Sequence, residues 1–222
     1  MIANPTNRRP IQARGSSIAV KIASVLTRAQ IKPNMISVFS VVFAVMAGVC
    51  FAATAFVPTA FIVAVLFVLG ALFVLLRLLC NLFDGMVAIE GGFQTKSGEV
   101  FNELPDRTSD AVILIGFGYA AGAIPFAIEL GYIAAILAII TAYVRALGAA
   151  TGVGQNFTGP MAKAHRMAVV IVASILSAIA VFWWTCYVWI VAIALGVIVL
   201  GTLVTIVRRT VWVTRALENK NE

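Results

Sequence analysis

The sequence has little charge. Charged side chains make up 11% of the 222 residues, hydrophobic residues make up 62%, and the mean hydropathy is +1.03. A soluble globular domain carries about 25% charged residues, so this composition excludes that class. Apolar runs of this density are typical of helices that cross a lipid bilayer. We therefore expect an all-α integral membrane protein.

Residue types that often build reactive centres are also scarce. The chain has one histidine, His165, and three cysteines, Cys50, Cys80 and Cys186. The cysteines lie in or beside apolar runs and show no paired spacing. We interpret them as small buried residues, and we predict neither a disulfide nor a cysteine-ligated metal. A single histidine without a partner is poor evidence for catalysis.

The N-terminal segment lacks the apolar run of a cleavable signal peptide, because residues 1–35 contain no such stretch. Between Ser16 and Gln30 apolar residues recur at helical spacing, which predicts an interfacial amphipathic helix. The alternative is a cytoplasmic extension that does not touch the membrane. We therefore assign residues 1–35 to a cytoplasmic N-terminal segment that carries this helix.

Six long apolar runs follow and predict six transmembrane helices. They cover residues 36–57, 59–88, 100–122, 126–150, 164–184 and 187–208. We expect residues 36–208 to form one membrane domain and residues 209–222 to form a basic cytoplasmic tail.

The net charge of +7 comes from basic residues that are scattered between apolar runs. They never form one face, so we expect no nucleic-acid partner, and we expect contacts with anionic lipid headgroups and phosphates. The predicted turns at 55–60, 121–130 and 183–187 contain no lysine or arginine. The positive-inside rule then places both termini and the 81–110 segment on the cytoplasmic side of the membrane.

The 81–110 segment holds most of the acidic residues of the chain, although apolar runs flank it on both sides. Its six acids are Asp84, Glu90, Glu99, Glu103, Asp106 and Asp110. Carboxylates at the end of a membrane helix are costly to desolvate, so they indicate a functional site, most simply for a cation.

The spacing of these polar residues predicts two facing stripes. Asn81, Asp84 and Ala88 share one face of the helix that ends the second span. Along the next helix a second stripe steps by four residues and consists of Gly98, Asn102, Asp106 and Asp110. A tight hairpin would bring the two stripes together. Ligands that are all oxygens suit Mg²⁺ or Mn²⁺ and suit neither zinc nor copper.

This segment resembles the signature of the CDP-alcohol phosphatidyltransferase family, Asp-x-x-Asp-Gly-x-x-Ala-Arg, eight residues, Gly-x-x-x-Asp-x-x-x-Asp. Every gap matches, and the corresponding residues are Asn81, Asp84, Gly85, Ala88, Ile89, Gly98, Asn102 and Asp106. The first and third aspartates are asparagines here, and the arginine is Ile89. In its two asparagines the segment resembles a divergent bacterial branch of the family, and this resemblance implies a location in a bacterial-type inner membrane.

The resemblance implies transfer of a phosphatidyl group from a CDP-linked donor, typically CDP-diacylglycerol, to an alcohol acceptor, with release of CMP. It implies that Asp106 is the general base and that one or two Mg²⁺ or Mn²⁺ ions are bound by Asn81, Asp84, Asn102 and Asp106. It further implies that the CDP-binding residues are Asp84, Gly85, Ala88 and Gly98. The family also tends to form homodimers.

Basic residues outside the motif are candidates for phosphate or substrate binding. Lys163 and Arg166 lie three residues apart at the start of a predicted helix, and Arg145 lies near the cytoplasmic end of another. Positive-inside topology alone would also place them there, and Arg145 could simply extend to the interface.

Other interpretations of the acidic segment stay open. Asp84 and Asp106 could form a structural pair, and Asp110 could pair with Arg107. The whole chain could be a non-catalytic relative that binds a CDP-lipid or a divalent cation. A small transporter is disfavoured, because the first, fifth and sixth predicted spans lack deeply placed charged or amide residues.

Overall fold

The computed structural model describes residues 16–93, 98–183 and 186–219, apart from the side chains of residues 99, 101 and 102. All regular structure in these ranges is helical. The helices are α1 (Ser17–Arg28), α2 (Pro33–Ala53), the short 3₁₀ helix η3 (Thr54–Phe56), α3 (Ala60–Glu90), α4 (Gly98–Tyr119), α5 (Ala127–Ala150), α6 (Lys163–Ala180) and α7 (Tyr187–Glu218).

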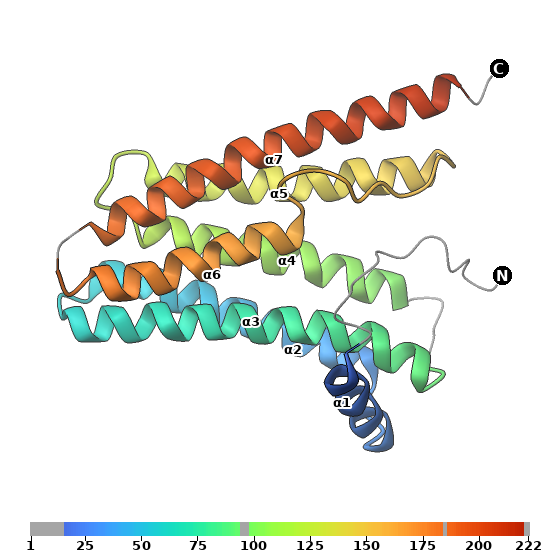
Figure 1. Ribbon diagram of the computed structural model, residues 1–222, viewed down its shortest axis with the longest axis horizontal. Coiled ribbons are helices and arrows are strands. Elements are labelled where there is room, and N and C mark those ends of the chain that lie inside the picture. The colour runs from blue at the N-terminus through green and yellow to red at the C-terminus, as the bar shows by residue number, and fades with distance from the viewer. Residues whose placement is uncertain (1–15, 94–97, 184–185, 220–222) are drawn as a thin grey trace.

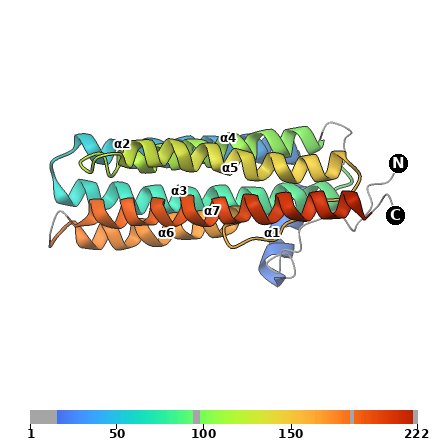
Figure 2. The same ribbon diagram turned by 90° about the horizontal axis from the view of Figure 1, so that it is seen from above.

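The six long helices form a closed bundle in which each packs against two main neighbours. The order around the bundle is α2, α4, α5, α7, α6, α3 and back to α2. Viewed along its side, the bundle has two layers, with α2, α4 and α5 in one and α3, α6 and α7 in the other (Figure 2). Helix α1 and the C-terminal end of α7 lie at the same end of the bundle (Figure 1). The end of α3, the start of α4 and the end of α5 lie at that end too (Figure 1).

Proline and glycine set several helix boundaries. Pro33 is the first residue of α2, where its fixed φ favours the helix and its missing N–H costs no hydrogen bond. The turn after α3 contains Gly92 with φ +65°, a backbone conformation that glycine adopts without strain. Pro105 lies inside α4. It therefore removes one hydrogen bond from the helix that carries Asp106 and Asp110.

Glycines allow α4 to approach its neighbours closely. A Cβ atom on Gly116 would lie 2.3 Å from the carbonyl oxygen of Gly48 in α2. On the other side of α4, a Cβ atom on Gly118 would lie 3.0 Å from the Cα atom of Gly131 in α5. Small residues at helix crossings are a common way to pack membrane helices. In contrast, Gly196 has no atom within 4 Å of its Cβ position, so close packing does not explain that glycine.

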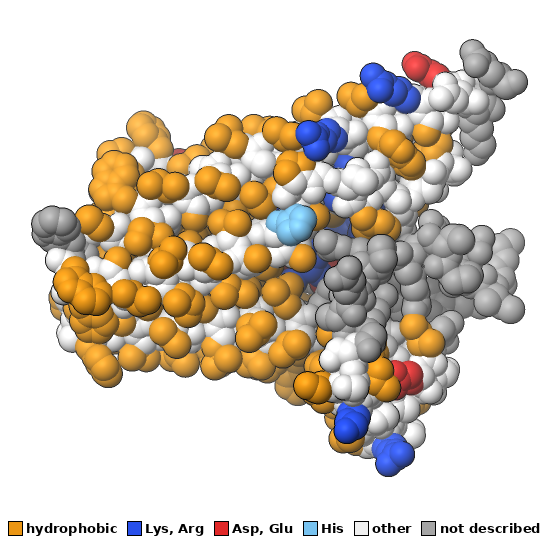
Figure 3. Space-filling view, viewed as in Figure 1, with side chains coloured by type: hydrophobic (Ala, Val, Ile, Leu, Met, Phe, Trp, Pro, Cys, Tyr) orange, Lys and Arg blue, Asp and Glu red, His pale blue; other side chains and the backbone are white. Residues whose placement is uncertain are grey.

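Apolar side chains fill the bundle and also cover its outside. Phe51, Phe67 and Phe117 are fully buried, and the Phe51 ring packs against the other two, tilted on Phe67 and edge-to-face on Phe117. Large apolar side chains on the outer faces of the helices are exposed, as is common on a surface that contacts lipid. Figure 3 shows hydrophobic side chains over most of the visible face, with the visible lysines and arginines toward the end where the termini lie.

Among the described residues, five helices are long and apolar enough to cross a membrane: α2 together with η3, α3, α5, α6 and α7. The chain is thus an all-helical integral membrane protein. Most of the range 100–122 is also helical, as α4, which ends at Tyr119, but α4 carries four charged residues between 103 and 110, so its hydropathy is lower. The count of six spans stays a prediction.

The structure also describes the N-terminal helix and the three cysteines. The N-terminal helix lies at Ser17–Arg28, where Ala19 and Ala23 are buried among residues of α3 while Ile18 and Val25 are exposed. All three cysteines are free, but Cys186 is exposed, so the prediction of a buried residue was wrong there. Cys186 immediately precedes α7, where little of the chain covers it.

Candidate functional site

Polar side chains from four helices meet inside the bundle, toward the end that holds α1 and the C-terminal end of α7 (Figure 1). They come from the last part of α3, the middle of α4, the first turn of α6 and the second turn of α2. On α3, Arg77, Asn81 and Asp84 follow one another at four and three residues, so they share one face. The two stripes predicted from the sequence do face each other, because Asn81 and Asp106 are in contact.

Asp106 receives three side-chain donors. Lys163 Nζ lies 2.5 Å from its Oδ2 atom. Asn81 Nδ2 donates to Oδ1 at 2.8 Å, and Arg77 Nη2 lies 3.3 Å from the same atom. The carboxylate therefore lies between an amide and two cations. Its side chain is 23% exposed, so it is the carboxylate of the buried cluster that a ligand reaches most easily.

Lys163 also joins the first motif asparagine to the last motif aspartate. Its Nζ donates to Asn81 Oδ1 at 2.7 Å as well as to Asp106. Asn81 in turn donates to Asp106, so the three side chains close a ring of hydrogen bonds. Lys163 itself is 20% exposed.

Asp84, the unchanged aspartate of the motif, is 4% exposed and has its own donors. The hydroxyl of Ser37 donates to Oδ2 at 3.0 Å, and the backbone N–H of Gly85 donates to Oδ1 at 2.6 Å. Asp84 lies within electrostatic range of Asp106 and Lys163. No role was predicted from the sequence for Ser37, which lies near the start of α2 and contacts Asp84 from 47 positions away in the chain.

A deeper ion-pair layer lies beneath these residues. Asp110 is buried and accepts from Arg77 Nη2 at 2.7 Å and from Arg166 Nη2 at 2.9 Å. Arg166 also donates to the Met161 carbonyl and to Thr141 Oγ1. The suggested pairing of Asp110 with Arg107 is wrong, because the Arg107 guanidinium pairs with Glu103. Arg77 is fully buried, and no site role was predicted for it.

Arg145 lies at the rim of the site. Its Nη2 atom contacts both carboxylate oxygens of Glu103, and its guanidinium lies 5.3 Å from the ring centroid of Phe157. The stacking and the ion pair hold the guanidinium against the bundle. Glu103 is only 27% exposed because Arg107 and Arg145 both contact it.

The remaining motif residues lie along the same two helices. Gly85 and Ala88 are partly buried on α3, and Gly98 begins α4. Asn102 lies in α4, but its side chain is outside the described residues. The predicted nucleotide-binding residues thus lie at the facing ends of α3 and α4.

The described oxygens fit a hard divalent cation by their chemistry. Asp84 and Asp106 supply carboxylates and Asn81 supplies an amide oxygen, which are the donors that Mg²⁺ and Mn²⁺ favour. Among the described residues, however, no three His, Cys, Asp or Glu side chains are close enough to hold a metal by themselves. Amide and substrate oxygens would have to complete the coordination.

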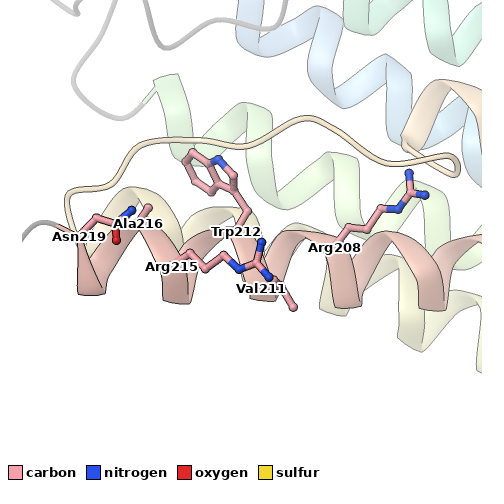
Figure 4. Close-up of a pocket in the computed structure, with 6 residues that line it drawn as sticks. All are labelled: Arg208, Val211, Trp212, Arg215, Ala216 and Asn219. Carbon is pink, nitrogen blue, oxygen red and sulfur yellow. The ribbon is translucent and has the colours of Figure 1, made fainter.

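A separate pocket of about 320 Å³ lies on the C-terminal part of α7 (Figure 4). It is lined by Arg208, Val211, Trp212, Arg215, Ala216 and Asn219. None of these residues belongs to the motif. We therefore take the cluster of α2, α3, α4 and α6 as the candidate site.

Comparison with known proteins gives a match to solved structures only, since no family model and no curated protein matches the sequence. The chain is similar to phosphatidylinositol phosphate synthase PgsA1 of Mycobacterium tuberculosis with CDP-DAG bound. The identity is 20%, the TM-score is 0.72, and the match covers 89% of this chain and 94% of that chain.

Two further structures of the same synthase match. The complex with manganese and citrate has 20% identity and a TM-score of 0.69, over 87% of this chain and 88% of that chain. The apo form has 22% identity and a TM-score of 0.64, over 86% and 95%. At these identities the likeness shows the fold. It confirms the sequence-based recognition at that level, because this synthase is a CDP-alcohol phosphatidyltransferase.

Proposed function

We propose that the protein transfers a phosphatidyl group from a CDP-linked donor, CDP-diacylglycerol in the first instance, to an alcohol acceptor in phospholipid biosynthesis. One observation carries this proposal. Residues of a phosphotransfer motif, Asn81, Asp84 and Asp106, meet within one polar cluster of a bundle that has the fold of a synthase which binds CDP-DAG.

In this proposal Asp106 acts as the general base. An acceptor hydroxyl attacks the phosphorus of the donor, the bond between that phosphorus and CMP breaks, and Asp106 takes the hydroxyl proton. Asp106 suits this role because it is the most exposed carboxylate of the buried cluster. One of the groups that now donate to Asp106 must then move away, so that a carboxylate oxygen can accept a hydrogen bond from the acceptor hydroxyl.

Asn81, Asp84, Asn102 and Asp106 would hold one or two Mg²⁺ or Mn²⁺ ions. When bound, such an ion neutralises charge on the pyrophosphate and stabilises the leaving group. The Ser37 hydroxyl and the Gly85 N–H fix the Asp84 carboxylate in one orientation, which favours a defined ligand geometry. That PgsA1 is found with manganese supports the same dependence here.

The donor and acceptor would bind at the open end of the same cluster. Gly85, Ala88 and Gly98 lack bulky side chains and would leave room for the cytidine nucleotide. Lys163, Arg145 and Arg166 would provide positive charge for phosphates. Of these three, Arg166 is the most buried, and its guanidinium already binds Asp110. Arg166 would therefore attract phosphates by its positive charge at a distance and not by direct contact.

The membrane arrangement is part of the proposal. We infer six spans, in which the charged half of α4 lines the site while its apolar half crosses the bilayer. Helix α1 lies at the interface, with exposed Ile18 and Val25 toward lipid. Both termini and the site face the cytoplasm of a bacterial-type cell, and the protein works as a homodimer. The domain limits 1–35, 36–208 and 209–222 stay as expected from the sequence.

A second candidate function is binding without turnover. The two asparagines remove charge from the metal ligands, and Lys163 bonds to two of the predicted ligand residues. A relative of this kind would bind a CDP-lipid or a divalent cation and release no CMP.

The test is an acceptor screen with purified protein, CDP-diacylglycerol and Mg²⁺ or Mn²⁺, with products identified by mass spectrometry. Catalysis predicts CMP and one new phospholipid, both lost in Asp106→Asn. No CMP with any acceptor, from protein that binds the donor, would favour the second candidate. Activity that appears only in the double variant Asn81→Asp, Asn102→Asp would indicate a site disabled by the asparagines.

A further inference from the structure

We propose that the ammonium group of Lys163 occupies the place of the divalent cation when the site is empty, and that the metal must displace it in order to bind. This inference rests on the proposed function, because it concerns the metal ligands named there. It gives Lys163 a role beyond phosphate binding: it keeps the ligand residues assembled without a metal.

The contacts of Lys163 are those of a bound cation. Its Nζ atom lies 2.5 Å from Asp106 Oδ2 and 2.7 Å from Asn81 Oδ1. These atoms belong to residues at the two ends of the motif, one on α3 and one on α4. An ion that bound both oxygens at about 2.1 Å would need the space where the ammonium lies. Lys163 and the metal therefore exclude each other.

Charge balance leads to the same conclusion. The described cluster contains three carboxylates, from Asp84, Asp106 and Asp110. It also contains three side-chain cations, from Arg77, Lys163 and Arg166. With both sets ionised, the cluster is neutral without a metal. A divalent ion added beside Lys163 would leave two uncompensated positive charges in a largely buried site, which is unfavourable.

Lys163 is the cation that can leave. Arg77 also contacts Asp106, but it is fully buried and is held by Asp110 as well. Lys163 is the first residue of α6, its side chain is 20% exposed, and its ammonium group contacts Asn81 and Asp106. A flexible four-carbon stem lets the ammonium move to the rim, where a donor phosphate would receive it.

The test measures metal binding, independently of turnover. Protein in detergent micelles is titrated with Mn²⁺, and free Mn²⁺ is followed by electron paramagnetic resonance without nucleotide. Lys163→Met removes the competing charge and should raise the Mn²⁺ affinity about tenfold or more. Lys21→Met is the matched control, because Lys21 is exposed on α1, and its affinity should stay within about twofold of wild type.

Metal-free stability gives an independent readout. Without Lys163, Asp106 and Asn81 lose their shared donor, so the variant should melt at a lower temperature than wild type without Mn²⁺. It should also gain more stability from Mn²⁺ than wild type does. A folded Lys163→Met protein with wild-type or weaker Mn²⁺ affinity would overturn the inference.

A measurement on the wild-type protein covers the case in which the variant does not fold. Saturating Mn²⁺ should increase acetylation of Lys163 by an amine reagent, followed by mass spectrometry, while Lys21 in the same molecule stays unchanged. Equal Lys163 labelling with and without bound Mn²⁺ would refute displacement. If neither wild type nor Lys163→Met bound Mn²⁺, even with CDP-diacylglycerol present, the metal-dependent function itself would fail.

Discussion

The buried pairing of Asp110 with two arginines makes a quantitative prediction for Asp110→Asn. Arg77 is fully buried, and among the described residues its Nε and Nη1 atoms have no hydrogen-bond partner. Within the described part of the chain, Arg77 forms ion pairs with Asp106 and Asp110. Arg166 forms its ion pair there with Asp110. The substitution thus leaves the buried positive charges of Arg77 and Arg166 without the Asp110 carboxylate. Asp106 still compensates part of the charge of Arg77.

Removing one partner of a buried ion pair costs about 3–5 kcal/mol. For a chain of this size, 1 kcal/mol corresponds to about 2–4 °C in melting temperature, so we expect a decrease of about 6–20 °C. A thiol-reactive fluorophore provides the assay, because Cys50 and Cys80 are free and partly buried and become accessible on unfolding.

The matched control is Asp106→Asn, at a carboxylate with 23% exposure where water compensates part of the loss. Its melting temperature should fall by clearly less than that of Asp110→Asn. In the double variant Asp110→Asn, Arg166→Met one uncompensated charge is gone, so it should be more stable than the sum of the single effects predicts. A decrease below about 2 °C for Asp110→Asn would refute the assignment of Asp110 as the central counter-charge.

Three further predictions concern packing, substrate binding and the metal ligands. Gly116→Ala places a Cβ atom 2.3 Å from the Gly48 carbonyl oxygen and should destabilise the α2–α4 contact by about 1–3 kcal/mol, whereas Gly196→Ala, with no atom within 4 Å, should not lower the melting temperature. Equal melting of both would contradict the close approach of the helices. Arg145→Met should raise the KM for the donor or acceptor with little change in melting temperature, because Arg145 lies at the rim against Glu103 and Phe157. An unchanged KM would leave Arg145 as a structural residue. Asn81→Asp adds a carboxylate beside Lys163 and should tighten Mn²⁺ binding about tenfold in the titration, while weaker binding would argue against Asn81 as a ligand.

The sequence predicted the helical bundle and the facing of α3 and α4 because both follow from local periodicity. Asn81 and Asp84 share a face of α3, Asp106 and Asp110 share a face of α4, and one short connection lets these faces meet. The apolar runs likewise predicted the long helices, although α7 continues past residue 208 to Glu218. Hydropathy did not predict this extension because arginines there mark a membrane boundary without ending the helix.

Contacts between distant parts of the chain could not be predicted in the same way. Lys163 reaches Asn81 from 82 positions further along the chain, through the packing of α6 on α3. Arg77 offered one usable signal, because it precedes Asn81 by one helical turn and shares its face. Arg77 lies in an apolar run of the sequence, and the two carboxylates of α4 that hold it inside the bundle come from 29 and 33 positions further along the chain.

The central claim is that this cluster performs metal-dependent phosphotransfer with Asp106 as the base. The most direct measurement is CMP release from CDP-diacylglycerol by purified wild-type protein with its best acceptor, with and without Mn²⁺. The account predicts release that requires Mn²⁺ and falls by at least about 10²-fold in Asp106→Asn. Release that continues at the wild-type rate in Asp106→Asn, or in the presence of a metal chelator, would contradict it.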